Sequence, residues 1–306
     1  MRIAVVGAGA IGSYYGAKLA RTECDVNFLM RSQLEDVRRA GIHVREKEGG
    51  FRVTNLKCYG TTPEIGPCDL VLVALKTTAN GALLELIPPL LHAGTMLVTL
   101  QNGLGNEEFL AEHFGADRVL GGLCFVCLNR IAPGVIDHHD VGRLAVGEYK
   151  GEPRQRTFAV VELFARAGVN CSVADDLRVE RWRKLVWNIP FNGLAVAAGG
   201  VTTDVILRDH DLHRATQALM AEIINAANAC GVPVSQNEAE LQLQRTASLG
   251  AYKPSTLIDF EAGRPLEIDA IWGEPLRRAR AAGASTPRLE MLCALLTSLD
   301  RQCQLS

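Results

Sequence analysis

The feature that most constrains the fold is a glycine pattern near residue 7. Gly7, Gly9 and Gly12 follow the apolar run "RIAVV" directly and lead into a stretch with helical character that begins at Ala10. In such strand–turn–helix units the first glycine permits a tight turn, the second lets a pyrophosphate approach the backbone, and the third lets helix and strand pack closely. The helix start, Ala10 and Ile11, then offers N–H groups and a positive dipole end to phosphates. The pattern predicts a Rossmann-type dinucleotide site.

The first half of the chain continues this alternation of strands and helices. Short apolar strands are expected at 25–30, 69–75 and 95–100, with a hairpin around Gly49 and Gly50 within 42–55. Such alternation predicts an α/β fold with a doubly wound, mostly parallel sheet. Further strands are expected at 119–126, 134–139, 143–149 and 170–174.

The character of the chain changes near Asp176. Strand-like runs end there, and helical periodicity takes over, with a helix start at 202–204, a stop at Gly231 and another boundary between Gly283 and Pro287. We therefore expect a Rossmann-type dinucleotide-binding domain over 1–175 and an all-helical domain over 176–306.

The composition narrows the classes of function. Hydrophobic residues make up 48% and charged residues 22% of the 306 residues, as in soluble globular proteins. The net charge of −2, without a basic run, gives no support for binding nucleic acid or an anionic membrane. No apolar run reaches the roughly 20 residues that span a bilayer. Nine scattered cysteines without a secretory leader favour a reducing cytoplasm.

No metal site is expected. Cys124 and Cys127 have the spacing of a metal knuckle, but they lie in an apolar strand-like run, where residues three apart point to opposite faces. No second cysteine pair completes a zinc site. The pair is therefore interpreted as structural.

The end of the second strand suggests which dinucleotide is bound. NAD-selective folds place an acid there for the ribose hydroxyls, whereas this chain has Met30, Arg31 and Ser32. Arg31 suits a 2′-phosphate through charge-assisted hydrogen bonds, so NADP(H) is favoured over NAD(H). The alternative is a solvated surface arginine.

Two further strand ends carry polar residues. Lys76 follows "LVLVAL", and Asn102 stands in "QNG" after "MLVTL". Ligands of doubly wound sheets lie outside the carboxyl ends of the strands, so both are candidates for the cofactor site. Lys76 as a surface lysine and Asn102 as a turn former before Gly103 remain alternatives.

A polar row crosses an otherwise apolar helix in the second half. Lys184, Asn188 and Asn192 recur every fourth residue in "RWRKLVWNIPFN", so they share one helix face, although Pro190 disturbs the helix locally. Burying such groups without partners costs several kcal/mol. They therefore face a polar ligand or form a buried hydrogen-bond network. A lysine suits carbonyl reduction, because an ammonium stabilises the developing alkoxide and then protonates it.

Taken together, the motifs identify a resemblance. The chain resembles the ketopantoate reductase (2-dehydropantoate 2-reductase) family over essentially its whole length. The matching segments, in order, are "GAGAIG" at 7–12, Arg31, "LVLVALKT" at 70–77, "QNGLGNEE" at 101–108, "GVIDHHDVGRLAVGE" at 134–148, "RWRKLVWNIPFN" at 181–192 and "KPSTLIDFEAGRPLEID" at 253–269.

The resemblance implies reduction of ketopantoate to pantoate with NADPH, a cytoplasmic step of pantothenate biosynthesis. It implies that Lys184 is the catalytic lysine and that Glu267 completes the active site. Asn188, Asn192 and Ser255 would hold the substrate, together with Asn102 where nicotinamide and substrate meet. The residues that would serve the cofactor are Gly7, Gly9, Ala10, Ile11, Gly12, Arg31, Lys76 and Asn102. It also implies that the cluster at 138–140 binds no metal.

The chain departs from the family pattern beside the expected pocket. "GLAVAAGG" follows Asn192, Thr256 replaces a usual Met, Leu266 replaces a usual Thr, and Tyr252 stands where some members have an amide. These departures leave the reduction chemistry intact and the substrate open, so a reductase of another small branched 2-oxo acid is one alternative. A non-catalytic NADP(H)-binding sensor is a second alternative, of a different class, and the presence of Lys184 and Glu267 speaks against it. The expected partner is a small 2-oxo acid, and a homodimer is compatible with the sequence.

Overall fold

The computed structural model describes residues 1–46 and 49–305, with the backbone alone at 139–141. It separates into two compact units, the first made of residues 1–101 and 106–177, and the second of residues 102–105 and those from 178 onward. Within the described residues, no helix combines the length and apolar character needed to cross a membrane. The functional division expected at residues 175–176 remains a prediction.

The first unit contains a doubly wound parallel sheet, as predicted. Six strands run in the order β5-β2-β1-β6-β7-β8, and each pairs with its neighbour in parallel. This is the strand order of a dinucleotide-binding fold, whose order reverses between the first strand and its neighbour β6. The bounds are β1 Arg2–Val6, β2 Asp25–Leu29, β5 Lys57–Tyr59, β6 Leu70–Val73, β7 Met96–Thr99 and β8 Val119–Ala132.

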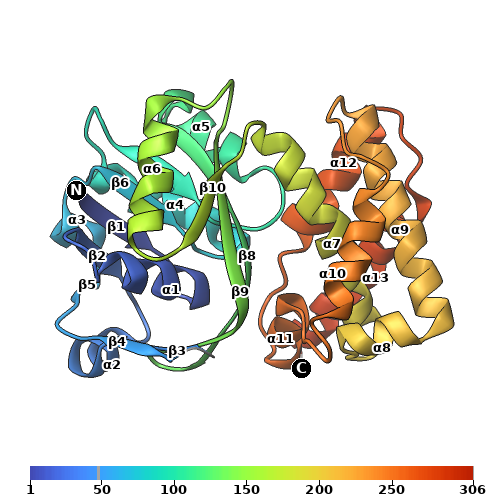
Figure 1. Cartoon of the computed structure of the whole chain (residues 1–306), viewed down its shortest axis with the longest axis horizontal. Coiled ribbons are helices and arrows are strands. Elements are labelled where there is room, and N and C mark those ends of the chain that lie inside the picture. The colour runs from blue at the N-terminus through green and yellow to red at the C-terminus, as the bar shows by residue number, and fades with distance from the viewer. Residues whose placement is uncertain (47–48, 306) are drawn as a thin grey trace. The chain divides into compact units, whose positions relative to one another are not determined.

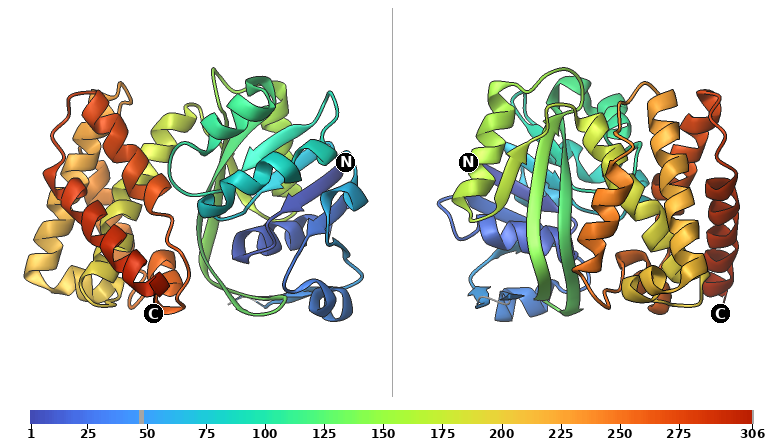
Figure 2. Two further views of the ribbon diagram at one scale, coloured as in Figure 1. Left: turned by 180° about the vertical axis from the view of Figure 1, so that it is seen from behind. Right: turned by 45° about the vertical axis from the view of Figure 1, so that its right-hand side comes forward.

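Both faces of this sheet are covered, because its strands are apolar on both sides. Ile3 and Val5 pack in one core with helices α1 (Ala10–Leu19) and α6 (Gln155–Arg166). Ala4 and Val6 belong to a separate core on the opposite face, with α4 (Leu83–Leu86) and α5 (Asn106–Phe114). Helices α1 and α6 lie in front of the sheet in Figure 1, and the view from behind in Figure 2 brings α4 and α5 forward. Alternate residues of one strand thus serve two helical layers.

A long antiparallel hairpin extends the sheet beyond β8. Its second strand, β9 (Val135–Glu148), is continuous, so the separate strands expected at 134–139 and 143–149 are one (Figure 2). The predicted hairpin within 42–55 is confirmed as β3 (Ile42–Glu46) and β4 (Phe51–Val53), although Lys47 and Glu48 lie outside the described residues. Strand β3 pairs with β9, as does β10 (Asn170–Val173). The short edge strand β5 was not expected.

The remaining elements of the first unit are short. Helix α2 follows β2, and the segment between β6 and β7 is divided into three short helical pieces, η1, α4 and η2. Gly81 and the pair Pro88-Pro89 account for the breaks, since both residue types weaken helices. The bounds are α2 Leu34–Ala40, α3 Thr62–Ile65, and the 3₁₀ turns η1 Thr77–Ala82, η2 Pro88–Leu90 and η3 Ala116–Arg118.

The regular elements of the second unit, within its described residues, are helices joined by loops. Helix α7 continues through Pro190 and supplies much of the core, including Trp182, Ile189 and Phe191. The boundaries predicted at 202–204, Gly231 and Pro287 are confirmed by the ends of α8, α9 and α13. The bounds are α7 Leu177–Ala197, α8 Thr203–Arg208, α9 His210–Ala229, α10 Glu238–Ala247, α11 Ser255–Glu261, a π-helical turn Asp269–Gly273, α12 Glu274–Ala281 and α13 Pro287–Leu305.

Candidate active site

The turn between β1 and α1 has the geometry that its glycines predict. Gly7 adopts a φ of +104°, and a Cβ placed there would lie 2.5 Å from the backbone nitrogen of Leu75. A Cβ on Gly12 would lie 2.0 Å from the carbonyl oxygen of Gly7, so only glycine allows the helix to pack against the turn. A Cβ on Gly9 would meet no atom within 4 Å. Two glycines are therefore required by packing, and the third faces open space.

The start of α1 is suited to an anion. Gly9 is the N-cap residue and provides no side chain to cap the helix, and the first turn, which includes Ala10 and Ile11, carries no acidic residue. Among the described residues, no side chain occupies the cap position. Backbone N–H groups at a helix N-terminus, together with the positive end of the dipole, attract phosphate. These residues fit the pyrophosphate of a dinucleotide.

The end of β2 presents the predicted arginine and one residue that sequence reasoning missed. Arg31 is exposed directly after the strand. Gln33 is 5% exposed, and its amide nitrogen donates to the carbonyl of Ala8 (2.6 Å) while its oxygen accepts from the N–H of Gly134 (2.9 Å). Gln33 therefore ties the glycine turn to the tip of the β8–β9 hairpin. No sequence signal marked these long-range contacts.

The ends of β6 and β7 are joined by buried amides. Lys76, beyond β6, is exposed and stands at the N-cap of η1. Gln101, beyond β7, donates to the carbonyl of Leu75 (2.9 Å) and to the side-chain oxygen of Asn80 (2.7 Å). Sequence reasoning noted "QNG" but gave Gln101 no role. These hydrogen bonds join the segment after β6 to Gln101, which Asn102 follows in the chain.

That following residue, Asn102, belongs to the second unit. Residues 102–105 pack against the π-helical turn, where the N–H of Leu104 donates to the carbonyl of Ala270 (2.9 Å). Gly103 has a φ of +84°, and a Cβ there would lie 2.3 Å from that same carbonyl oxygen. Gly103 makes the turn possible, as the turn-former alternative expects. The side chain of Asn102 contacts Lys184.

The ammonium of Lys184 donates to the side-chain oxygen of Asn102 at 2.8 Å. Lys184 is half-buried on α7. The next residue of the row, Asn188, is only 5% exposed, and its side chain makes no hydrogen bond to the described residues. Because a buried amide without a partner is costly, its position favours contact with a polar ligand.

The last residue of the row anchors another element. Asn192 is 2% exposed, and its side-chain oxygen accepts from the backbone N–H of Thr256 (3.2 Å). Ser255, half-buried, is the first residue of α11 and directly precedes that contact. Glu267, 6% exposed, lies just before the π-helical turn on which Leu104 packs. The second unit therefore brings α7, α11, the π-helical turn and the 102–105 loop together.

Neighbouring side chains hold α7 in place. Arg183 is ion-paired with Glu238 (2.9 Å) and Glu180 (2.7 Å). Burial alone would lower the pKa of Arg183, but these two carboxylates raise it above its ordinary value, so the residue stays charged. The indole nitrogen of Trp272 donates to the carbonyl of Ile189 at 3.1 Å. These contacts fix the helix on either side of Lys184.

One departure from the family pattern has a packing reason. A Cβ on Gly193 would lie 2.6 Å from the side chain of Leu292 and 3.1 Å from the indole nitrogen of Trp272. Glycine after Asn192 therefore lets Trp272 approach α7 closely.

Of the residues at 138–140, the structure describes the side chain of His138 alone, and this side chain contacts Glu46. His138 lies 3.1 Å from Glu46, which also pairs with Lys18 of α1 (3.1 Å). The side chains of His139 and Asp140 lie outside the described residues. Burial would raise the pKa of Glu46, but hydrogen bonds from Lys18 and His138 lower it. Within the described residues, no group of three or more metal-ligating side chains gathers.

Comparison with known proteins decides the family. The family model described as "Ketopantoate reductase PanE/ApbA" matches residues 3–151, and its C-terminal counterpart matches residues 176–300. A 2-dehydropantoate 2-reductase of Nostoc sp. is 37% identical over 98% of this chain and 95% of its own. The chain belongs to the ketopantoate reductase family. The crystal structure of 2-dehydropantoate 2-reductase from Geobacter metallireducens is 45% identical, with a TM-score of 0.95 over 97% of this chain and 99% of that one.

A second solved ketopantoate reductase agrees with this assignment. The structure of 2-dehydropantoate 2-reductase from Methylococcus capsulatus is 33% identical, with a TM-score of 0.90 over 100% of this chain and 99% of that one. The predicted fold, the oxidoreductase class and NADP(H) as the cofactor are thereby confirmed at the level of the family. The roles of individual site residues remain predictions.

Proposed function

We propose that this protein reduces 2-dehydropantoate to pantoate with NADPH, using Lys184 as the proton donor. The observation on which the proposal rests is the hydrogen bond from Lys184 to Asn102. It joins a catalytic candidate to Asn102, in the loop that follows β7. We propose that residues 1–175 bind the cofactor and that residues 176–306 supply the substrate and catalytic groups.

The cofactor residues divide by the part of the dinucleotide that they suit. The N–H groups after Gly9, at Ala10 and Ile11, suit the pyrophosphate, because Gly7 and Gly12 shape the turn and Gly9 leaves space. Arg31 suits the 2′-phosphate, and Lys76 and Asn102 would contact the nicotinamide half. When bound, NADPH supplies the hydride.

Lys184 suits the role of proton donor. An ammonium has three N–H donors, so the bond to Asn102 does not by itself exhaust them. Another N–H can point to the substrate ketone oxygen, stabilise its developing negative charge and donate the proton. Asn102 would orient the lysine for this step. Glu267 is buried and lies just before the π-helical turn. Its carboxylate would complete the site by accepting a hydrogen bond from Lys184 or from the substrate hydroxyl.

Three residues suit the substrate. The side-chain amide of Asn188 can both donate to and accept from the substrate, since it makes no hydrogen bond to the described residues. Asn192 uses its oxygen on Thr256, which leaves its NH₂ group as a donor. Ser255, at the start of α11, would donate to the substrate carboxylate. A donor set of this kind matches a small 2-oxo acid that carries a carboxylate and a hydroxyl.

The test is the oxidation of NADPH with a panel of 2-oxo acids that includes 2-dehydropantoate. We expect 2-dehydropantoate to have the highest kcat/KM. Replacing the proton donor should lower kcat by about 10²–10⁴-fold, so Lys184→Ala should lose turnover while keeping its affinity for NADPH. Lys57→Ala, an exposed lysine on β5, is the matched control.

Each other outcome has a definite meaning. A higher kcat/KM with another branched 2-oxo acid would identify a paralogue with the same chemistry. NADPH binding without turnover on any acid would identify a sensor. Near-normal turnover of Lys184→Ala would remove the lysine from the mechanism.

We further propose a cytoplasmic location and a homodimer formed through the helical half. The cysteines support the first proposal, because all nine are free thiols, as in a reducing compartment. Fractionation of the native cells would test the location, and the dimer is considered below.

A further inference from the structure

A hollow in the protein surface lies beyond the end of β2, and none of the functions proposed above uses it. It measures about 260 Å³ and is lined by Ser32 and Gln33 from the segment after β2, and by residues 130–133 from the tip of the β8–β9 hairpin. Pockets that hold whole ligands commonly measure about 300–1,000 Å³. The hollow is therefore of a size to receive one end of an extended ligand.

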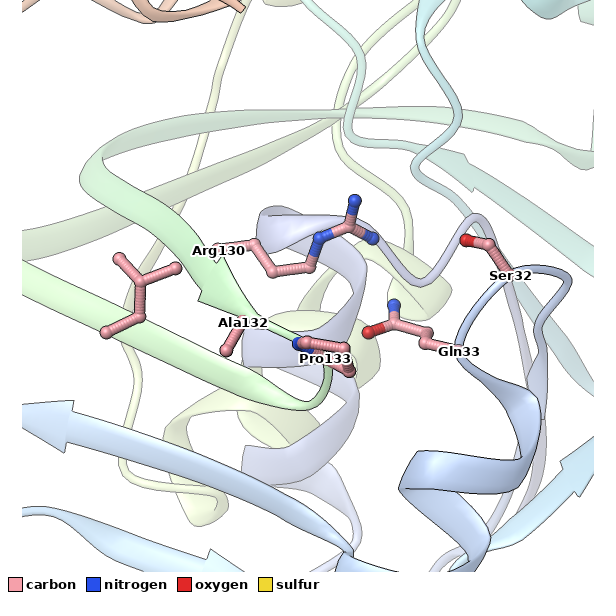
Figure 3. A pocket seen from close by; sticks show the side chains of 6 residues that line it. Ser32, Gln33, Arg130, Ala132 and Pro133 are labelled. Atoms are coloured by element: carbon pink, nitrogen blue, oxygen red, sulfur yellow. The ribbon is translucent and has the colours of Figure 1, made fainter.

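Arg130 is the charged group of this hollow. Its side chain is exposed, and within the described residues it forms no ion pair or hydrogen bond. Figure 3 shows it reaching from β8 toward Ser32 and Gln33. None of the lining residues is acidic. A guanidinium and a hydroxyl that line one hollow without a carboxylate favour an anion, and phosphate above all.

A β-bulge lies directly after Arg130. Arg130 pairs with Ile136 and Ala132 pairs with Val135, so β8 contains one more residue than β9 between these pairs. Such bulges turn a side chain away from the direction that a regular strand would give it. The hairpin tip is also anchored, because the N–H of Gly134 donates to Gln33.

Gln33 links this anchor to the cofactor turn. Its amide nitrogen donates to Ala8, between the first two glycines of the pattern. The hollow therefore lies beside the glycine turn and directly after Arg31, where a doubly wound fold binds the adenosine ribose. Arg31 likewise forms no ion pair or hydrogen bond within the described residues.

We propose that Arg130 is a second binding residue for the adenosine 2′-phosphate of the cofactor, and that the hairpin tip thereby contributes to selection of NADPH over NADH. This inference rests on the proposed function, since it assumes that the adenosine end lies at β2. Ser32 adds a hydroxyl donor, and Gln33 keeps the tip in register with the turn. Two arginines from separate segments would then share one phosphate dianion.

The test measures binding of two small probes by calorimetry rather than activity. Adenosine 2′,5′-bisphosphate carries the 2′-phosphate, and adenosine 5′-monophosphate lacks it. Loss of one charge-assisted contact should weaken binding of the bisphosphate by about tenfold or more. We therefore expect Arg130→Ala to bind the bisphosphate that much more weakly and to bind the monophosphate almost as well as wild type. Arg130→Lys should recover part of the loss. Arg52→Ala, an exposed arginine on β4, is the matched control and should behave as wild type.

Arg31→Ala separates this inference from the proposed function. If Arg31→Ala loses the preference for the bisphosphate and Arg130→Ala keeps it, the role of Arg130 is overturned while the NADPH assignment stands. An equal loss of both probes in Arg130→Ala would also overturn the inference, since it would indicate damage to the hairpin. If the wild-type protein binds both probes equally, the assignment of the 2′-phosphate to β2 fails, and the inference fails with it.

Discussion

Glycines of one short motif are retained for different physical reasons. Gly12 has no room for a methyl group, because the carbonyl of Gly7 lies 2.0 Å from the position of its Cβ. Gly9 has room, and its φ of −74° is open to any residue. The fold therefore requires Gly12, whereas we propose that Gly9 is required by the ligand.

This difference gives a prediction from two substitutions that each add one methyl group. Overpacking a tight site lowers the free energy of unfolding by about 1–3 kcal/mol. Because the added methyl group of Gly12→Ala would meet backbone, which cannot move aside easily, we expect a loss at or above the upper end of that range. Its melting temperature should fall clearly. Gly9→Ala should keep its melting temperature, yet bind NADPH about tenfold more weakly, since its methyl group enters the pyrophosphate space.

Thermal melts and NADPH titrations of both variants supply the measurement. A folded, thermally normal Gly12→Ala would contradict the packing argument. Unchanged NADPH affinity in Gly9→Ala would contradict the placement of the pyrophosphate.

The joining of β9 to α6 illustrates how elements are held by buried charge. Glu148, the last residue of β9, is nearly fully buried and accepts from Thr157 of α6 at 2.6 Å. Arg156, also on α6, pairs with it through two nitrogens. Burial would raise the pKa of Glu148, but the hydrogen bonds from Arg156 and Thr157 outweigh burial and lower it.

Stability should therefore depend on pH through this carboxylate. A pKa lowered on folding contributes stability that is full above the unfolded pKa, which is 4.5, and is lost as the pH falls through the lower folded value. We expect Glu148→Gln to lower the free energy of unfolding by about 2 kcal/mol at pH 7. The difference from wild type should shrink as both proteins are acidified.

Urea unfolding at a series of pH values measures this difference. Glu152→Gln, an exposed neighbour, is the control and should show little effect at any pH. A Glu148→Gln difference that stays constant down to about pH 3 would mean that the carboxylate charge is not what stabilises the junction.

Element boundaries show where local patterns are sufficient. The stop at Gly231 and the boundary between Gly283 and Pro287 follow from backbone chemistry of single residues, and both were predicted correctly. The merging of two expected strands into β9 was not predicted. Its continuity depends on partners on both sides, β8 and β3, which local sequence does not reveal.

At the scale of the whole molecule, we expect a homodimer formed through helix α13. Met291 is 62% exposed, and Leu295, one turn later on the same helix, is also exposed. Two exposed apolar side chains on one helix face could form part of an association surface, since contiguous apolar patches mark such surfaces. Light scattering after gel filtration should give a mass twice that of the chain, and a double change of Met291→Glu and Leu295→Glu should give the monomer mass.

Phe158→Glu, at an exposed phenylalanine on α6, is the control and should leave the dimer intact. A monomeric wild-type protein would refute this expectation.

The sequence by itself determined the doubly wound sheet, the glycine turn, the polar row on α7 and the family. These depend on periodicity, on backbone freedom at single residues and on motif order, all of which are local properties of the chain. Only the tertiary structure decided that Asn102 meets Lys184, that Asn192 anchors α11, and that Gln33 ties the hairpin tip to the glycine turn. Each of these contacts joins residues at least 25 positions apart, and the partner of a buried polar group is chosen by packing of whole elements rather than by its neighbours in sequence.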